Sequence, residues 1–162
     1  MGNERWIVNA SPLILLWKSD YLYLLSELAD VICVPKTVKG EIQVKDEGTP
    51  IVQALQDDTK FSIIEDRDIT PDLWAWDLGR GETQVLMHTK GGGAQRAVLD
   101  DMEARRCAKA YGVAVIGTLG IVGRAKRKGI IRRARPVIHH LCDVGLYASD
   151  ELVQWVLSEV GE

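Results

Sequence analysis

Residues 97–129 read AVLDDMEARRCAKAYGVAVIGTLGIVGRAKRKG, and the fold follows from this stretch. The apolar run 97–99 predicts a buried strand, residues 102–111 predict a helix, and residues 113–116 predict a second strand. A strand, a helix and a strand in this order are typical of two parallel strands joined by a crossover helix. A further helix is then expected to end at Gly129. The stretch therefore indicates a β-α-β unit.

The same alternation continues on both sides of this unit. A strand at 6–9 runs into Ser11 and Pro12, which predict a helix N-cap followed by proline at the first helical position. Residues 48–50 and 66–71 are expected to be turns. The other expected elements are strands at 31–34 and 61–64 and helices at 13–17, 21–28, 35–44, 51–55, 82–90, 136–144 and 149–160, with Gly91, Gly92 and Gly93 ending the helix at 82–90. Such alternation favours an α/β fold with a mostly parallel sheet covered on both faces.

The composition is that of one globular domain of ordinary size. The chain has 162 residues, of which 46% are hydrophobic and 27% charged, so we expect residues 1–162 to form a single domain with one core. The apolar stretch 13–17 is too short to span a bilayer and the N-terminus lacks a signal-peptide pattern, so we expect a cytoplasmic protein without a membrane partner. The widely spaced Cys33, Cys107 and Cys142 indicate reduced thiols.

Positive charge is concentrated in one segment. Residues 104–142 contain no Asp or Glu but hold half of the 20 Lys and Arg residues, although the net charge of the chain is only -3. These residues are Arg105, Arg106, Lys109, Arg124, Lys126, Arg127, Lys128, Arg132, Arg133 and Arg135. Such a segment can attract phosphate groups, because each neutralised phosphate releases counterions. A solvated basic face or an interface with an acidic protein would give the same pattern.

Polar side chains stand directly after three of the expected strands. Ligands of open parallel sheets bind beyond the carboxyl ends of the strands. This rule selects Asn9, Ser11, Asp100, Asp101 and Thr118, and Glu41 and Glu82 lie on helices that can point into the same crevice. Clustered carboxylates repel one another unless a cation lies among them, and oxygen ligands favour Mg²⁺ or Mn²⁺. Such an ion activates water and stabilises charge on a phosphate during phosphodiester hydrolysis.

The same residues resemble the PIN domains, and in particular the short prokaryotic PIN-like proteins of the DUF3368 type, which are related to VapC toxin ribonucleases. The resemblance covers nearly the whole chain. It is carried by residues 7–14 (IVNASPLI), Val34-Pro35 with Val38 and Glu41, Gly81-Glu82, residues 98–101 with Ala104-Arg105, and residues 117–120 and 125–129. The specific segments are the first, at 7–14, and the long last one, which runs from Val98 to Gly129.

The resemblance implies a three-layer α/β/α PIN-like fold and a metal-dependent endoribonuclease that uses Mg²⁺ or Mn²⁺. It also implies the toxin of a toxin-antitoxin pair, with single-stranded or structured RNA, a cognate antitoxin and a second copy of the chain as partners. The four-acid site of the family maps onto Asn9, Glu41, Glu82 and Asp100, with Asp101 as a substitute for the fourth acid. Because Asn9 supplies an oxygen but no charge, we expect weakened activity. The expected RNA contacts are Ser11, Arg105, Thr118, Arg124, Lys126, Arg127 and Lys128.

Other interpretations stay open at this stage. Asn9 or Ser11 can cap the first helix, and Asp101 can be the N-terminal acid of its own helix. Trp74 and Trp76 can stack on a base, although an oligomer interface is the preferred interpretation. The whole chain can also be a catalytically inactive PIN-like module that binds nucleic acid or a partner protein. A receiver-like domain is disfavoured, because it would need an acidic pair after its first strand.

Overall fold

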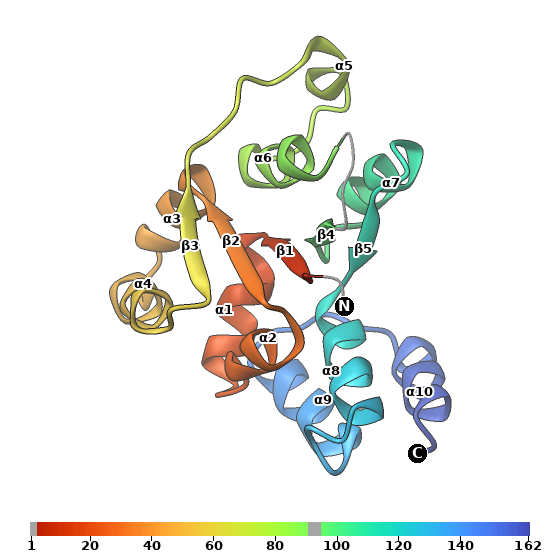
Figure 1. The fold of residues 1–162 in the computed structure, drawn as a ribbon. Helices are drawn as coiled ribbons and strands as arrows, with labels where there is room; N and C mark the ends of the chain where they lie inside the picture. The colour runs from red at the N-terminus through yellow and green to blue at the C-terminus, as the bar shows by residue number, and fades with distance from the viewer. Residues whose placement is uncertain (1–2, 91–94) are drawn as a thin grey trace.

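Five parallel strands form the centre of the molecule in the computed structural model, which describes residues 3–90 and 95–162 (Figure 1). The strands are β1 (Arg5–Val8), β2 (Val31–Pro35), β3 (Phe61–Ile64), β4 (Gln95–Val98) and β5 (Ala114–Ile116). Their order in the sheet is β3-β2-β1-β4-β5, and every neighbouring pair is parallel. The predicted parallel α/β architecture is therefore confirmed.

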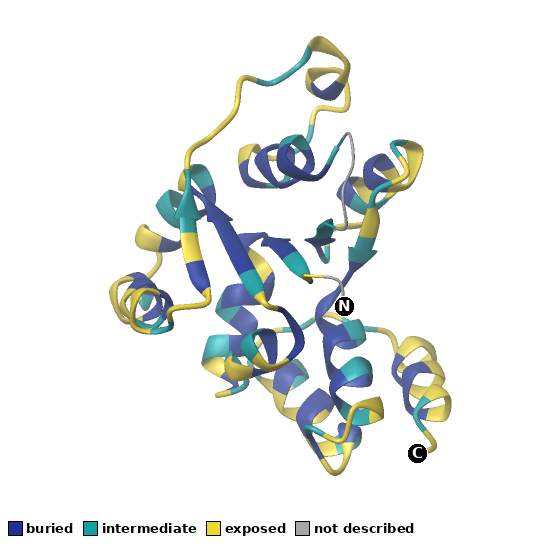
Figure 2. Cartoon of the chain, in the orientation of Figure 1, coloured by how far each residue is buried: buried dark blue, intermediate teal, exposed yellow. Residues whose placement is uncertain are grey.

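Helices cover both sides of this sheet. They are α1 (Ala10–Lys18), α2 (Tyr23–Leu28), α3 (Lys36–Gln43), α4 (Gly48–Asp57), α5 (Pro71–Trp74), α6 (Arg80–Thr89), α7 (Met102–Ala110), α8 (Thr118–Arg127), α9 (Ala134–Asp143) and α10 (Asp150–Glu159). In Figure 1, α6 lies above the strands while α2 and α8 lie below them. Figure 2 shows that burial is concentrated in the central strands and on the helix faces turned toward them. None of the helices described is long and apolar enough to cross a membrane.

Alternation along β1 decides which side chains meet which helix. Successive residues of a strand point to opposite faces of the sheet. Trp6 faces α8, where the guanidinium of Arg124 lies 5.9 Å from its ring centroid. Asn9, directly after the strand, lies on the other face and contacts Glu82 of α6. The first polar residue after β1 is therefore directed to the α6 side.

The strand order reverses at β1. From β1 the chain adds β2 and then β3 on one side, and it returns to place β4 on the other side. Val8 of β1 pairs with Val98 of β4, and the Asn9 N–H donates to the Val98 carbonyl over 3.2 Å. Asn9 and Asp100 thus follow the two strands that flank the switch point, which is where ligands of such sheets bind.

The structure corrects the predicted start of the first helix. Ser11 was expected as its N-cap, but α1 begins at Ala10 and Asn9 holds the cap position with extended backbone (φ -81°, ψ 168°). Pro12 consequently falls at the third helical position. That position is tolerated because the first N–H groups of a helix have no partner within it.

Further boundaries differ from expectation, and three of them involve proline or the start of a strand. Residues 48–50 form the first turn of α4, which accepts a proline for the same reason. Pro71, the last residue of the turn predicted at 66–71, instead starts the short helix α5 after an extended Thr70. The strand predicted at 97–99 is β4 and begins earlier, at Gln95. The predicted helix stop at Gly91 to Gly93 lies outside the described residues.

Candidate functional site

A cleft of about 640 Å³ opens beside the end of β1. Its lining comes from α1, α3, the turn after α3, and the first turn of α6: Asn9, Ala10, Ser11, Ile14, Leu15, Lys18, Glu41, Val44, Lys45, Asp46, Glu47 and Glu82. Three of the four positions of the predicted acidic site, Asn9, Glu41 and Glu82, therefore share one cleft. Ser11, predicted to contact RNA, lines it as well.

Asn9 is the most buried polar group of this cleft, with 4% of its surface exposed. Its Nδ2 donates to Oε1 of Glu82 over 3.2 Å, and its side chain makes no capping hydrogen bond to α1. The amide has to be oriented this way, since its oxygen would otherwise face a carboxylate. Oδ1 is left buried without a hydrogen-bond partner. Buried oxygens are rarely left unpaired, so this atom is a natural position for a ligand.

Glu41 reaches the cleft from α3 and meets the start of α6. The N–H of Gly81 donates to Glu41 Oε1 over 3.0 Å. A Cβ on residue 81 would lie 2.6 Å from Glu41 Oε2 and 2.9 Å from Asn9 Oδ1. Any larger residue at 81 would therefore displace these two side-chain oxygens from their present positions.

The charge of Glu41 is not well compensated. Burial raises the pKa of its carboxyl group, and the nearby charge of Glu82 raises it further. The Gly81 N–H and the ammonium group of Lys45 oppose these effects and lower the pKa. The cleft thus holds a carboxylate that would gain from a cation beside it.

Glu82 lies in the first turn of α6, where the helix dipole favours a negative charge. Gly79, which precedes α6, packs against the Glu82 carboxylate so closely that a Cβ there would collide with it. The glycines at 79 and 81 therefore let the two acids and Asn9 approach one another. A dipole role and a ligand role for Glu82 are both compatible with this position.

Asp100 is held by the start of α8 rather than by the cleft. Its two oxygens accept hydrogen bonds from Thr118, one from the backbone N–H (2.7 Å) and one from Oγ1 (2.6 Å). Gly117 leaves the space, since a Cβ there would lie 2.9 Å from Asp100 Oδ1 and 2.7 Å from Nη1 of Arg105. Asp100 does not line the cleft, although it flanks the same switch point. Thr118 is fully buried, so as it lies it positions Asp100.

Asp101 acts locally in the structure. It is the N-cap of α7, and its carboxylate accepts from the Ala104 N–H over 2.9 Å. It is exposed and does not line the cleft. The hydrogen bond from Ala104 therefore supports the capping interpretation of Asp101, and no contact of its side chain supports a metal role.

Much of the predicted basic segment is engaged within the chain. Arg105 donates to the Leu99 carbonyl (3.0 Å), Arg124 pairs with Glu4 (3.1 Å), and Lys126 donates to the Arg132 carbonyl (2.7 Å). Arg127 and Lys128 at the end of α8 are exposed and form no ion pair among the residues described. None of these side chains lines the cleft.

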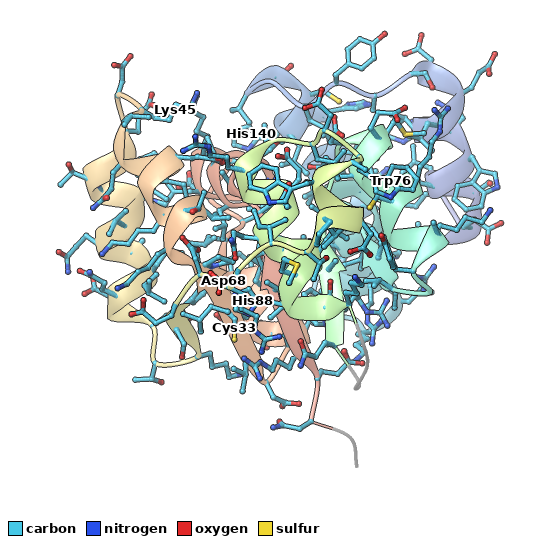
Figure 3. The ribbon with its side chains drawn as sticks, turned by 90° about the horizontal axis from the view of Figure 1, so that it is seen from above. Cys33, Lys45, Asp68, Trp76, His88 and His140 are labelled. Carbon is cyan, nitrogen blue, oxygen red and sulfur yellow. The ribbon has the colours of Figure 1, made fainter. Side chains whose placement is uncertain are left out.

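The donors of the cleft suit a hard divalent cation. Asn9 Oδ1, Glu41 and Glu82 offer only oxygen, the ligand type that Mg²⁺ and Mn²⁺ prefer, and one of these oxygens is buried and unpaired. Across residues 3–90 and 95–162 no three His, Cys, Asp or Glu side chains are grouped closely enough to hold one ion. His88 (Figure 3), on the last turn of α6, is buried with Nε2 unpaired. A metal would therefore depend on Asn9 as the third donor.

Sequence reasoning missed the glycines and the second half of the cleft. The Gly79-Arg80-Gly81 spacing before an acid was a usable signal, because paired glycines often mark a close approach to backbone. Lys18, Lys45, Asp46 and Glu47 gave no signal, since they join the cleft only through the packing of α1 against α3.

Known proteins resemble this chain in family and in fold. The model of the DUF3368 family, described as a PIN domain, matches residues 5–162. Among solved structures, the PIN domain endonuclease Utp24 is similar over 70% of this chain and 84% of that chain, with a TM-score of 0.51 and 11% sequence identity. No curated protein matches the chain. At this identity the structural likeness shows the fold alone, and it confirms the PIN-like α/β fold predicted from the sequence.

Proposed function

This chain belongs to the DUF3368 family of PIN domains, and from that premise we propose that it is a metal-dependent endoribonuclease whose activity is weakened by Asn9. The observation that carries the proposal is the unpaired, buried Oδ1 of Asn9 in a cleft shared with Glu41 and Glu82. Such an oxygen beside carboxylates is the type of ligand that a hard divalent cation prefers.

In the proposed reaction the residues have separate tasks. Asn9, Glu41 and Glu82 would hold Mg²⁺ or Mn²⁺, and when bound such an ion polarises water and offsets the charge that develops on a phosphate. Thr118 keeps the Asp100 carboxylate in one orientation at the edge of the switch point. Asp100 is then available to orient water by accepting a proton or a hydrogen bond. Asn9 adds no negative charge, which lowers affinity for the ion.

A second function is favoured by a different observation. Both oxygens of Asp100 already accept hydrogen bonds, and no three-carboxylate group exists among the residues described. A PIN domain with these features can bind RNA or a partner without cleaving it. This alternative predicts salt-sensitive binding and no products.

One experiment separates the two functions. Labelled single-stranded RNA is incubated with the purified protein in Mn²⁺, Mg²⁺ or EDTA, beside the variants Asp100→Asn, Glu82→Gln and Asn9→Asp. The nuclease proposal expects slow cleavage in Mn²⁺, none in EDTA, loss in Asp100→Asn and Glu82→Gln, and a gain in Asn9→Asp. Cleavage that persists in EDTA and in Asp100→Asn would overturn it. Activity found only in Asn9→Asp would favour the binding module.

The toxin role is the finer part of the proposal and rests on the resemblance to VapC toxins. We expect expression of the chain to slow growth of a bacterial host, and Asp100→Asn to relieve that effect. A cognate antitoxin would be recognised as a protein that copurifies with the chain and suppresses cleavage. Equal growth with the native and Asp100→Asn chains would contradict the toxin role. The nuclease proposal would still be tested by the cleavage assay.

A further inference from the structure

A second groove lies at the open edge of the sheet and has a volume of about 440 Å³. Its walls are α7 and β5, the last strand in the order β3-β2-β1-β4-β5. In Figure 1, β5 lies at the margin of the sheet next to α7. This α7–β5 groove is lined by Met102, Arg105, Arg106, Lys109, Gly112, Val113 and Val115. It shares no residue with the cleft beside the end of β1.

The wall formed by α7 is positively charged. Four of its residues line the groove at the spacing of one helix face: Met102, Arg105, Arg106 and Lys109. No Asp or Glu is among the described residues that line the groove with these three cations. The cleft beside β1, by contrast, is lined by four acids and two lysines. The charge of the α7–β5 groove therefore favours an anionic occupant.

The three cations are available to a ligand. Lys109 is exposed and forms no ion pair within the part of the chain that the structure describes. Arg106 pairs with Glu103 over 2.6 Å, but both side chains are more than half exposed, and such a pair contributes little to stability. Arg105 donates from Nη1 to the Leu99 carbonyl, and a guanidinium has further N–H donors.

The wall formed by β5 offers backbone groups. The Leu99 N–H donates to the Ile116 carbonyl over 3.1 Å, so Ile116 directs its peptide groups toward β4. Alternate residues of a strand direct these groups to opposite sides. Val115 therefore directs its N–H and C=O away from β4, to the edge where no described strand pairs with β5. Such unpaired edge groups are a template for a further strand.

The spacing of the cations suits a strand in this position. α7 connects the parallel strands β4 and β5, so it runs back along them. Arg105 and Lys109 are one turn apart, about 6 Å along the helix axis. Side chains on one face of a strand are about 6.6 Å apart. Carboxylates at every second residue of a strand added beside β5 can therefore meet both cations.

Two other occupants fit this groove less well. A nucleic-acid strand has phosphates for the cations, but it lacks the peptide groups that complete the hydrogen bonds of an edge strand. A second copy of this chain, related by a two-fold axis, would bring the same three cations against one another. An acidic protein segment supplies both carboxylates and peptide groups.

We propose that the α7–β5 groove binds an extended acidic segment of a partner protein. The segment adds a strand to the free edge of β5 and pairs its carboxylates with Arg105, Arg106 and Lys109. Main-chain hydrogen bonds supply affinity, and the cations select an acidic sequence. The inference does not depend on the proposed nuclease, because the groove and the cleft beside β1 have no lining residue in common.

A synthetic peptide in which Glu alternates with Val tests this assignment. Its fluorescence anisotropy is measured with the full chain and its variants. Arg106→Ala and Lys109→Ala are each expected to weaken binding about two- to fivefold, the scale of one exposed ion pair, and Lys109→Glu should weaken it further. Glu103→Gln should strengthen binding, because it releases Arg106 from its ion pair. A peptide with Lys in place of Glu should not bind.

Methylated peptides test the added strand. Two peptides carry N-methyl groups on either the Glu amides or the Val amides, and both keep the charges. Because alternate N–H groups point to opposite sides of a strand, methylation should abolish binding in one of the two peptides only. Binding of both methylated peptides would overturn the added strand.

The matched controls are Arg127→Ala and Lys128→Ala, which remove exposed charge outside the groove and should bind the peptide like the native chain. No binding of the Glu-Val peptide by the native chain, or an equal loss in the control variants, would overturn the inference. Single-stranded RNA is measured beside the peptide. If Lys109→Glu weakens binding of the RNA but not of the peptide, the groove is a nucleic-acid site and the inference is wrong.

Discussion

Asn9 has two polar atoms with different environments, and the difference suggests how the residue affects the site. Nδ2 is bound to Glu82, and Oδ1 has no partner. Asn9→Asp would replace the donor with a second carboxylate facing Glu82. We expect this change to lower the free energy of unfolding of the metal-free protein by about 1–3 kcal/mol, through a lost hydrogen bond and like-charge repulsion.

The same substitution should strengthen metal binding, because it adds a charged oxygen ligand. Calorimetric titration with Mn²⁺ is expected to show a gain of about tenfold or more for Asn9→Asp, roughly 1.4 kcal/mol. Saturating Mn²⁺ should also restore the lost thermal stability. Asn9→Ser is the control, since it shortens the side chain without adding charge. Equal Mn²⁺ affinity in the native chain and Asn9→Asp would contradict a ligand role at this position.

Glu41 makes the stability of the protein depend on pH. Its pKa in the folded protein is raised above the ordinary value of 4.5. The contribution of such a group to stability is fully present below pH 4.5 and is lost as the pH rises through the folded pKa. Glu41→Gln keeps an acceptor for the Gly81 N–H and removes the charge. At neutral pH it should therefore stabilise the metal-free protein, by less than about 1 kcal/mol because the group is partly exposed.

Urea unfolding in EDTA, compared at neutral pH and below pH 4.5, measures this effect. The advantage of Glu41→Gln should shrink as the pH falls, and the m-value should stay unchanged. The same variant is expected to lose Mn²⁺ affinity, because it removes a charged ligand. A Glu41→Gln protein that is less stable than the native chain at neutral pH would show that the charge is compensated.

At the scale of the elements, Asn9, Glu82 and Asp101 lie at the starts of α1, α6 and α7. Asp101 caps α7 through the Ala104 N–H. We expect Asp101→Ala to lower the free energy of unfolding by about 1 kcal/mol, the usual cost of a lost N-cap, and to leave Mn²⁺ affinity unchanged. Asp101→Asn retains the cap and should match the native chain in both measurements. A drop in Mn²⁺ affinity in Asp101→Asn would restore the metal role that the sequence suggested.

The elements themselves were largely predictable because each carries a periodic pattern. The strand-helix-strand stretch at 97–129 contains β4, α7, β5 and α8 almost at their predicted bounds. The rule that ligands bind where strand order reverses then selected Asn9 and Asp100, which do flank that point. The periodicity of the sequence thus predicted the fold, and the topological rule predicted two polar residues at the switch point.

What the sequence did not predict depends on contacts between distant segments. Asn9 and Ser11 were both candidates for the cap of α1, and the sequence did not predict that Asn9 takes the cap position while its side chain turns to Glu82 of α6. Lys18 and Lys45 line the same cleft only because α1 packs against α3. Propensity and spacing describe one element at a time, so they contain no information on such pairs.

At the scale of the whole molecule, the basic segment contacts residues near both ends of the described chain. Arg124 pairs with Glu4 before β1, and the Glu162 side chain accepts from the N–H groups of Ala134 and Arg135 at the start of α9. The pKa of Glu162 is lowered by these backbone hydrogen bonds. In the sequence, residues 104–142 look like a nucleic-acid-binding segment because they contain many cations and no acid. The acidic partners of Arg124 and Arg133, Glu4 and Glu162, lie outside this segment. Part of its charge is therefore structural.

Self-association is the last property we propose, with a second copy of the chain as the partner. Trp74 on α5 is 59% exposed, and α5 stands away from the sheet in Figure 1. Exposed tryptophans of this kind are typical centres of interfaces, where truncation costs about 2 kcal/mol or more. Trp74→Ser should thus weaken a dimer about 30-fold or more, a shift that sedimentation velocity over a concentration series would detect. Trp155→Ser on α10, where the side chain is 61% exposed, is the matched control. A native chain that stays monomeric, or a dimer lost only in Trp155→Ser, would contradict an interface at α5.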